Sequence, residues 1–230
     1  VLAASFNQML EKIDKLMQDE KEQEALTRVY ELKALTSQIN PHFLYNTLDT
    51  IIWMAEFQDH QKVVDITKAL SNYFRLSLNA GEEIVTLRQE IEHVRQYLFI
   101  QKERYGDKLE YTIFEPDDIP DIKLPKIVLQ PLVENAIYHG IKESERPGKI
   151  TITVSKRDAF IDICIADNGV GIKENTTSTK ELGGVGIKNI KERLTLFFGE
   201  AFSMDIESEP NAYTKVYLHL PLKEEGHANS

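Results

Sequence analysis

Residues 167–171, with the sequence DNGVG, decide how the second half of this 230-residue sequence is interpreted. They follow residues 160–166, whose apolar alternation is typical of a β-strand. The carboxylate of Asp167 at the end of such a strand can accept a hydrogen bond from an exocyclic amine such as that of adenine. The two glycines that follow let the backbone approach a flat ring closely. A plain turn between two strands explains the same stretch equally well, so its interpretation depends on the segments around it.

A second glycine-rich stretch, GGVG at residues 183–186, opens a predicted helix that ends near Phe198. Free N–H groups at a helix start, with no Cβ in the way, bind anions such as phosphate. The stretch is not the phosphate loop GxxxxGK[ST]. It is not the dinucleotide motif GxGxxG either, because Asn189 stands where the third glycine would be. A flexible loop that leads into a capped helix is the alternative interpretation.

A polar pair, Glu134 and Asn135, lies on a further predicted helix. We expect this helix to begin at Pro125 and to end near His139, because Gly140 follows. The carbonyl oxygen of an inward-facing asparagine can bind Mg²⁺, and a neighbouring glutamate can orient a water molecule. An ordinary polar pair on a helix surface is the alternative.

Five short stretches with strand character surround these helices. They cover residues 109–114, 150–154, 160–166, 202–207 and 214–220. Strands and helices together predict an α/β sandwich over residues 104–224, in which the Gly-, Ser- and Thr-rich residues 168–183 form a loop. A capping-box pattern at Thr86–Gln89 starts the helix that leads into this sandwich.

The first eighty residues have helical periodicity. One apolar ladder covers residues 2–16 with the 4-3-4-3 spacing of a coiled-coil seam, and a second ladder covers residues 25–46. The two ladders are out of register by two residues, so a supercoil must change phase between them. A loop near Asp59 and His60 then predicts a returning helix. Such a hairpin cannot bury both of its apolar faces alone, whereas a dimeric four-helix bundle can.

The composition limits the classes of function. The net charge of −10 argues against a nucleic acid as the main partner, because binding to phosphates requires clustered lysine and arginine. The single cysteine, Cys164, excludes a disulfide within the chain. No apolar run is long enough to span a membrane, no signal peptide is present, and the sequence begins at Val1 in a helical pattern. We therefore expect a piece of a longer protein.

One histidine lies within the second apolar ladder, where residues 38–48 have the sequence QINPHFLYNTL. His42 precedes Phe43 on the seam, so it lies at the edge of the packed face and can reach solvent. An imidazole has a pKa of about 6.5 in water, so most imidazoles are neutral at pH 7 and able to attack. A lone histidine on a helix more often has a structural role, which is the alternative.

The order of these motifs resembles a known superfamily. A helix with a Glu-Asn pair, a strand that ends in DxGxG, a loop, and a helix that starts with GxG follow one another in the ATP-binding domain of the GHKL superfamily. This domain is shared by DNA gyrase, MutL, heat-shock chaperones and histidine kinases. Residues 38–48, 131–136 and 184–194 are further similar to sensor histidine kinases of the YesM and LytS type. This resemblance covers about residues 32–222, and residues 1–17 more loosely resemble the last helix of a HAMP signalling module.

The resemblance implies a role for each motif. His42 would be the phosphoacceptor, Asn135 the Mg²⁺ ligand and Asp167 the residue that binds adenine. Glycines would shape the site beside adenine and beside the phosphates: Gly169, Gly171, Gly184 and Gly186. Residues 172–183 would form the ATP lid.

Two positions depart from the commoner histidine kinases. The residue after the phosphoacceptor is often acidic and serves as a base, but here it is Phe43. The position three residues after the Mg²⁺-binding asparagine is often basic, but here it is Tyr138. Its neighbour His139 is counted among the nucleotide-binding residues. No general base is therefore named, and Glu134 is a candidate for polarising the attack.

Asn46 lies one helical turn after His42 on the same face. As a polar residue on the seam it can fix the register of the helices at some cost in stability. Alternatively, its amide can orient the phosphoaspartate of a regulator and an attacking water, as the matching position does in histidine kinases that double as phosphatases. We interpret it as catalytic.

The resemblance implies a sensor histidine kinase of a two-component system. It would use ATP and Mg²⁺ to phosphorylate His42 and would transfer the phosphoryl group to an aspartate of a response regulator. The chain would form a homodimer, bind no nucleic acid, and reach the membrane from the cytoplasmic side only through a missing N-terminal part. Two alternatives stay open: another enzyme on the same ATP domain, such as a serine kinase or an ATP-driven clamp, and a silent dimeric scaffold or nucleotide sensor.

The expected fold is therefore of the α+β class, with a helical-hairpin dimerisation domain followed by an α/β-sandwich ATP-binding domain of the GHKL (Bergerat) type. The expected domains are a signal-input helix at the end of a HAMP-like module, dimerisation and phosphotransfer helices, the ATP-binding domain and a disordered tail. They cover residues 1–24, 25–103, 104–224 and 225–230.

Overall fold

The computed structural model describes residues 41–78, 82–120, 122–172 and 184–222. The chain divides into two compact units, one up to Tyr45 and one from Asn46 onward. The first apolar ladder, most of the second, nearly all of the expected ATP lid and the expected C-terminal tail lie outside the described residues.

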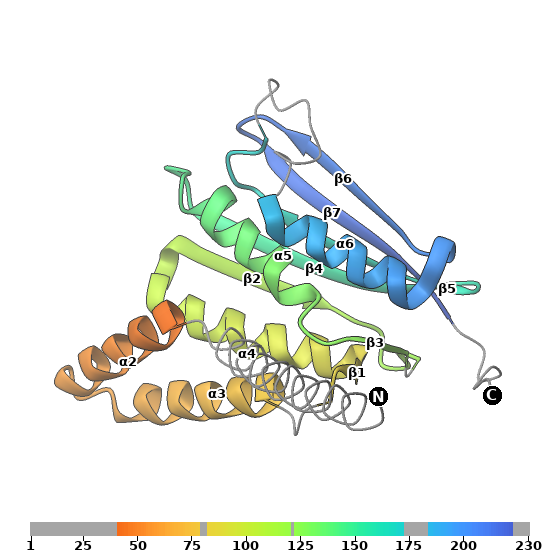
Figure 1. Cartoon of the computed structure of the whole chain (residues 1–230). Helices are drawn as coiled ribbons and strands as arrows, with labels where there is room; N and C mark the ends of the chain where they lie inside the picture. The colour runs from red at the N-terminus through yellow and green to blue at the C-terminus, as the bar shows by residue number, and fades with distance from the viewer. Residues whose placement is uncertain (1–40, 79–81, 121, 173–183, 223–230) are drawn as a thin grey trace, which may run out of the picture. The chain divides into compact units, whose positions relative to one another are not determined.

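Among the described residues, three helices precede the sheet: α2 (Pro41–Glu56), α3 (His60–Leu78) and α4 (Leu87–Tyr105). α2 and α3 correspond to the predicted helix and its returning partner, with the break at residues 57–59. α3 packs along α4 (Figure 1), which in turn contacts the strands and helices of the C-terminal sandwich.

The predicted capping box at the start of α4 is confirmed. The Gln89 N–H donates to the Thr86 hydroxyl at 3.2 Å, and the Thr86 N–H donates to the Gln89 side-chain oxygen at 2.8 Å. The apolar face behind it is buried, with Leu87, Ile91, Val94 and Leu98 at most 2% exposed.

A mixed five-stranded sheet follows, with the strand order β2-β4-β5-β7-β6 (Figure 1). β2 runs parallel to β4, and the other neighbours are antiparallel. The strands cover the five predicted stretches, most of them extended by a few residues. They are β2 (Leu109–Phe114), β4 (Gly148–Arg157), β5 (Phe160–Asp167), β6 (Ser203–Glu209) and β7 (Tyr213–Pro221).

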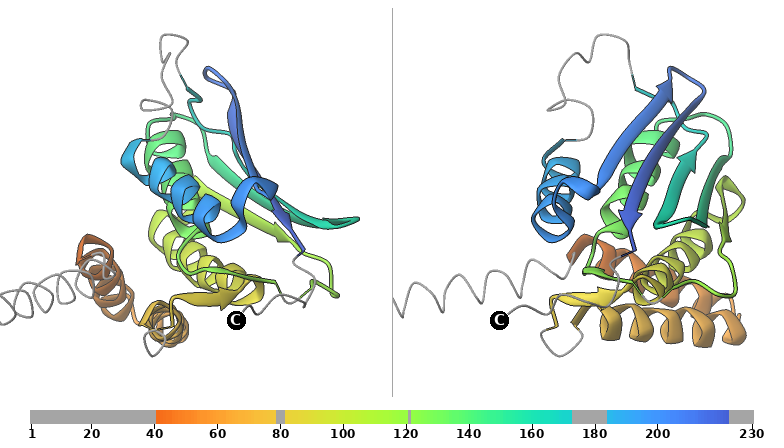
Figure 2. Two further views of the ribbon diagram at one scale, coloured as in Figure 1. Left: turned by 45° about the vertical axis from the view of Figure 1, so that its right-hand side comes forward. Right: turned by 90° about the vertical axis from the view of Figure 1, so that its right-hand side faces the viewer.

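The helices α5 (Leu129–Asn135) and α6 (Gly184–Phe198) lie on one side of this sheet (Figure 2). α5 continues as the π-helix η3 (Ala136–Ile141), which contacts β4, β5 and β7. Along β4 and β5, buried side chains alternate with more exposed ones. The buried aliphatic side chains form the core: Ile150, Ile152, Val154, Ile161, Ile163 and Ile165. The predicted α/β sandwich, and with it the α+β fold class, is confirmed.

The predicted start of the α5 helix is wrong. Pro125 ends a short strand, β3 (Lys123–Pro125), which pairs with β1 (Ile84–Thr86), and the helix begins only at Leu129. Between them, Ile127 has a left-handed φ of 57°, which a β-branched residue adopts only under constraint. The chain therefore turns after Pro125 instead of entering the helix there.

Candidate functional site

The end of β5 forms a buried corner with η3. Asp167 is 7% exposed, and its Oδ1 accepts a hydrogen bond from the Gly169 N–H at 2.8 Å. The next N–H, that of Val170, donates to the carbonyl oxygen of Gly140 at 3.1 Å. The backbone of the DNGVG stretch thus lies directly against the helix.

Glycines make this close approach feasible. A Cβ on Gly169 would lie 2.3 Å from the carbonyl carbon of Gly140, and a Cβ on Gly140 would lie 2.6 Å from Asp167 Oδ1. The prediction that Gly140 ends the helix is wrong, because the chain continues through it as a π-helix to Ile141. The absence of a side chain at Gly140 lets the helix pass over the Asp167 carboxylate.

The other side of the DNGVG stretch is joined to the turn between β6 and β7. The Asn211 N–H donates to the carbonyl oxygen of Val170 at 2.6 Å. Gly171 has a φ of +65°, and a Cβ there would lie 2.1 Å from the carbonyl oxygen of Glu209. The stretch is therefore held between a helix and a hairpin turn, with main chain on both sides.

Burial raises the pKa of the Asp167 carboxyl to about 6, and the hydrogen bond from the Gly169 N–H opposes this rise. The group is therefore mainly ionised at pH 7, when it accepts hydrogen bonds and donates none. A buried acceptor beside glycines is suited to a flat ring that carries an exocyclic amine.

Asn135, at the end of α5, has a side-chain nitrogen that lacks a hydrogen-bond partner among the described residues. Its Nδ2 is buried and has no hydrogen-bond partner among the described residues, and the same holds for the hydroxyl of Tyr138 three residues later. Unpaired buried donors are costly, which indicates a place for a group that is not part of the described chain. The unpaired Nδ2 suits a hydrogen-bond acceptor on such a group, whereas the predicted Mg²⁺ role would fall to the carbonyl oxygen of Asn135.

The described residues contain no cluster of three His, Cys, Asp or Glu side chains that could hold a metal ion. A Mg²⁺ ion beside the Asn135 carbonyl would therefore take most of its other ligands from phosphates and water, as this ion commonly does. The residues present are compatible with a metal that arrives with its nucleotide.

Glu134 faces other surroundings than Asn135, since adjacent helix residues do not face each other. Its Oε1 accepts a hydrogen bond from Gln130 Nε2 at 2.8 Å, and the same nitrogen donates to the Tyr73 hydroxyl of α3 at 2.7 Å. Burial raises the pKa of Glu134, and the Gln130 hydrogen bond lowers it. Burial raises the pKa of Tyr73 and of Tyr97 on α4, and the negative charge of Glu134 adds to this rise.

A carboxylate from α4 holds the start of α5. Glu90 is 2% exposed and accepts the N–H groups of Ile127, Val128 and Leu129 at 2.6, 2.8 and 3.0 Å. These include the free donors that every helix start presents. Burial raises the pKa of Glu90, whereas the three backbone donors lower it. The sequence gives no signal for this cap, because its acceptor belongs to another helix.

The predicted phosphate-binding helix is connected to the same segment. α6 begins at Gly184, and a Cβ on Gly186 would meet nothing within 4 Å. Further along this helix, the Arg193 guanidinium donates to the carbonyl oxygen of Lys126 at 2.7 Å. The start of α5 is therefore held from two sides, by α4 and by α6.

The other predicted site residues are placed as follows. His42 lies in the first turn of α2 and is exposed, whereas Asn46 is half-buried. The Nδ2 of Asn46 is buried and has no hydrogen-bond partner within the described ranges. His139 lies on η3 beside Gly140, with an exposed side chain.

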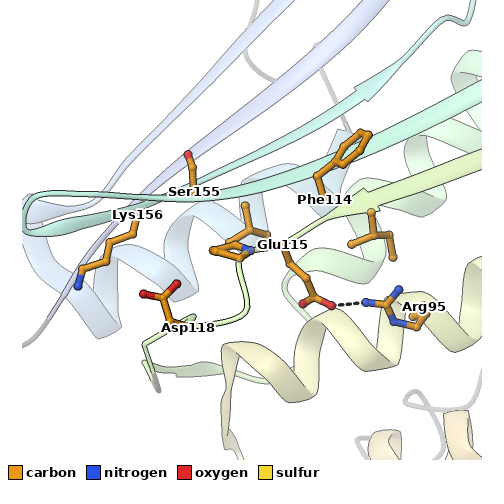
Figure 3. Close-up of a pocket in the computed structure, with 9 residues that line it drawn as sticks. Arg95, Phe114, Glu115, Asp118, Ser155 and Lys156 are labelled. Carbon is orange, nitrogen blue, oxygen red and sulfur yellow. Dashed lines mark hydrogen bonds and ion pairs between the residues drawn. The ribbon is translucent and has the colours of Figure 1, made fainter.

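A separate cavity of about 570 Å³ lies between α4 and the ends of β2 and β4 (Figure 3). Arg95 and Glu115 form an ion pair at its wall, and Lys156 of β4 lines it (Figure 3). Asp167 pairs with Ile150 near the opposite end of β4. With a rise of about 3.3 Å per residue, the two sites are roughly 20 Å apart along the strand. This cavity is therefore separate from the corner that Asp167, Gly169 and Gly140 form, which is the candidate nucleotide corner.

Comparison with known proteins defines the class. Residues 121–224 match the family of histidine kinase-, DNA gyrase B-, and HSP90-like ATPases, and residues 30–109 match the histidine kinase family. The sandwich and its glycine-lined corner are thus an ATP-binding domain of the GHKL type.

Similar proteins give the family. Over 98% of its length the chain is 35% identical to the sensor histidine kinase YesM of Bacillus subtilis, of which it covers 39%. It is 35% identical over 88% of its length to the sensor histidine kinase BtsS of Escherichia coli, covering 35% of that protein. It is 32% identical over 96% of its length to the sensor protein LytS of Bacillus anthracis, covering 38%. The chain belongs to the sensor histidine kinases of the YesM and LytS type.

The chain spans between 35% and 39% of the length of these relatives. Among the helices that the structure describes, none combines the length and the apolar character needed to cross a membrane.

Proposed function

We propose that this chain is an ATP-dependent protein-histidine kinase that phosphorylates His42 and passes the phosphoryl group to an aspartate of a response regulator. One observation carries the proposal. An exposed histidine at the start of α2, within the region that matches the histidine kinase family, shares a chain with a GHKL-type ATP-binding corner.

The nucleotide would be bound by groups from three elements. Asp167 at the end of β5 accepts a hydrogen bond from the adenine amine, and His139 on η3 lies beside the ring. Asn135 at the end of α5 binds Mg²⁺, and this ion neutralises phosphate charge when it is bound. Gly169 and Gly171 let the backbone lie close to the ring. Gly184 and Gly186 keep backbone N–H groups open toward the phosphates.

In the reaction, a neutral ring nitrogen of His42 attacks the γ-phosphorus of ATP. A P–N bond forms, the P–O bond to ADP breaks, and the ring loses the proton from its other nitrogen. Glu134 remains the candidate that polarises this attack. Since its carboxylate is bonded to Gln130, this role requires it to exchange that hydrogen bond for one near the reacting groups.

A homodimer is supported by the apolar surface of α2. Leu48, Ile52 and Trp53 are 42%, 57% and 62% exposed. Large apolar side chains that gather on one exposed helix face normally contact another protein surface. A second copy of the helical hairpin would cover them in a four-helix bundle.

Asn46 is assigned to dephosphorylation of the regulator. Its position one turn after His42 and its unpaired Nδ2 support this role, because an amide without a partner is available to orient another group. The structural alternative, in which the amide only fixes the register of the helices, predicts a partner for Nδ2 across the dimer interface.

The domain limits are part of the proposal. Residues 1–24 would carry the input from a HAMP-like module, residues 25–103 would dimerise and hold the phosphoacceptor, and residues 104–224 would bind ATP. Residues 225–230 would form the tail. The parent protein would be a membrane receptor with this part on the cytoplasmic side.

The proposal is tested by incubation with γ-labelled ATP and Mg²⁺, followed by treatment of the protein with acid and with alkali. A phosphohistidine is lost in acid and survives alkali. We expect label in the wild type and none in His42→Gln, which should still bind ADP. The matched control is His60→Gln, which removes an exposed histidine at the start of α3 and should keep the label.

Three results would contradict the proposal. Label in His42→Gln would show that another residue is the phosphoacceptor, and label that survives acid but not alkali would indicate a hydroxyl kinase. A wild type that binds ADP but never becomes labelled would favour a nucleotide sensor.

A further inference from the structure

One arginine outside all the motifs joins the nucleotide corner to the β6–β7 turn. The Nη2 of Arg146 lies 3.0 Å from the carbonyl oxygen of Gly169, 2.7 Å from that of Asn211 and 2.9 Å from that of Ala212. Arg146 belongs to the loop 142–147 between η3 and β4. A rigid guanidinium that donates to two separate loops fixes the distance between them.

The loop that Arg146 contacts is the one that orients Asp167. The N–H of Gly169 donates to Asp167 Oδ1 at 2.8 Å, and the carbonyl of the same residue accepts from Arg146. A glycine has no side chain to restrict its φ and ψ angles. The two hydrogen bonds therefore hold the peptide groups on both sides of this flexible residue.

The corner has other attachments that do not involve Arg146. Val170 is bonded to Gly140, and the side chain of Asn168 bonds to the Lys149 N–H at 2.6 Å and to the Pro147 carbonyl oxygen at 3.0 Å. These bonds hold the loop against η3 and β4. Loss of the exposed Arg146 side chain should therefore leave the fold intact and release the carbonyl of Gly169 together with those of Asn211 and Ala212.

We propose that Arg146 is a positioning residue that sets the selectivity of the site for adenine. It acts through Gly169, whose N–H keeps the Asp167 carboxylate in the orientation that accepts a hydrogen bond from the adenine amine. Guanine carries a carbonyl oxygen where adenine carries this amine, so an oriented carboxylate favours adenine and repels guanine. This inference rests on the adenine-binding role proposed for Asp167.

The test compares the affinities for ADP and GDP, measured by calorimetry in the presence of Mg²⁺, for the wild type, Arg146→Ala and Arg146→Lys. In Arg146→Ala we expect the affinity for ADP to fall about tenfold and the affinity for GDP to change less than about twofold. Arg146→Lys keeps a charged donor and should recover most of the selectivity. The melting temperature should stay close to that of the wild type in both variants.

The matched control is Arg157→Ala. It removes the same charge from the other end of β4, where a 78% exposed Arg157 side chain pairs with Asp162. The ratio of the ADP and GDP affinities should not change in this variant.

Equal losses of ADP and GDP affinity in Arg146→Ala would overturn the inference, because a purely structural clamp affects both nucleotides alike. An unchanged ratio of the ADP and GDP affinities, or a wild type that does not prefer ADP, would also overturn the inference. If Arg146→Ala does not fold, the ratio of the ADP and GDP affinities is measured in Arg146→Lys instead. This ratio should fall about threefold relative to the wild type. Absence of phosphohistidine in a wild type with intact ADP selectivity would refute the kinase proposal alone.

Discussion

The nucleotide corner and the contact between α3 and the ATP-binding domain are built in opposite ways. In the corner, main chain lies against main chain. A Cβ on Gly169 would lie 2.3 Å from Gly140, and the Asn211 N–H lies 2.6 Å from the Val170 carbonyl oxygen. No side chain separates these segments, so none can rotate to relieve a change.

At the α3 contact, buried polar side chains meet instead. The ring of Tyr73 stacks on His93 of α4 with centroids 4.6 Å apart and an interplanar angle of 15°, and its hydroxyl accepts from Gln130. The side chain of His93 also bonds to Ser77 of α3 at 2.7 Å. Burial lowers the pKa of His93 to about 4, so the ring is neutral at pH 7.

The difference separates a rigid part, the Asp167 corner, from a contact that can rearrange, that of α3 with α4 and α5. We call the first the frame and the second the joint. Main-chain contacts with glycine on both sides have one close-packed arrangement, which suits a site that must present Asp167 in a fixed orientation. Side-chain hydrogen bonds can exchange partners by rotation about χ angles, so a contact built from them can change its arrangement. Substitutions in the corner should therefore change stability and ADP binding, whereas substitutions at the α3 contact should change local motion and leave ADP binding unaltered.

The largest effect is expected for Gly169→Ala. The added methyl group meets the main chain of Gly140, which cannot rotate away. We expect the free energy of unfolding to fall by about 3 kcal/mol and the affinity for ADP to fall on the order of 100-fold. Urea unfolding and calorimetry with ADP measure the two effects.

The control for this variant is Gly199→Ala. Gly199 has a positive φ of +69°, unlike Gly169, and a Cβ there would meet nothing within 4 Å. Only the backbone strain of about 1 kcal/mol should appear, with unchanged ADP affinity. If Gly169→Ala bound ADP as the wild type does, the corner would not be a rigid frame.

The second effect is expected for Asp167→Asn, which should separate stability from binding. The rise of the Asp167 pKa from 3.8 to about 6 corresponds to about 3 kcal/mol of cost for the ionised form. The folded protein binds the proton more tightly than the unfolded chain, so this group reduces stability as the pH rises from about 4 to about 6.

An uncharged asparagine removes this cost. We expect Asp167→Asn to gain roughly 1–2 kcal/mol at pH 7, to lose most of that gain at pH 4, and to bind ADP more weakly. Urea unfolding at both pH values measures the stability difference. A variant that is equally stabilised at pH 4 and pH 7 would show that the gain has another cause.

Sequence patterns predicted the features that are formed by residues close together in the chain. The capping box of Thr86 and Gln89, the five strands and the DNGVG stretch each involve neighbours in the chain. The contacts that hold these segments together join distant residues. Arg146 lies 23 residues from Gly169, and Tyr73 lies 57 residues from Gln130.

The same reason explains the error at α5. Proline is common in the first turn of helices, so the residues around Pro125 predict a helix that begins there. The actual start is fixed by the carboxylate of Glu90, 37 residues before Ile127, which captures three backbone donors. A cap from another helix leaves no pattern around the helix that it caps. In the same way, the sequence around Gly140 predicts a helix end. In the structure this glycine instead lets the helix pack closely over Asp167.

The smallest effect is expected for Tyr73→Phe, which tests the joint. The ring that stacks on His93 is kept, and only the hydroxyl that accepts from Gln130 is lost. Gln130 can still donate to Glu134, so the cost should be about 1 kcal/mol. Because this bond links α3 to α5, amides of α3 should exchange with deuterium about fivefold faster, while those of β5 stay unchanged.

ADP affinity decides whether the joint is separate from the frame. In Tyr73→Phe it should match the wild type, because none of the hydrogen bonds described for the Asp167 corner involves α3. Tyr105→Phe, at the half-buried end of α4, serves as the control and should alter neither exchange nor binding. Faster exchange in α3 with unchanged ADP binding would mean that α3 can loosen without disturbing the nucleotide site. A loss of ADP affinity in Tyr73→Phe would instead show that the α3 contact and the Asp167 corner are coupled, so that α3 could not loosen without weakening nucleotide binding.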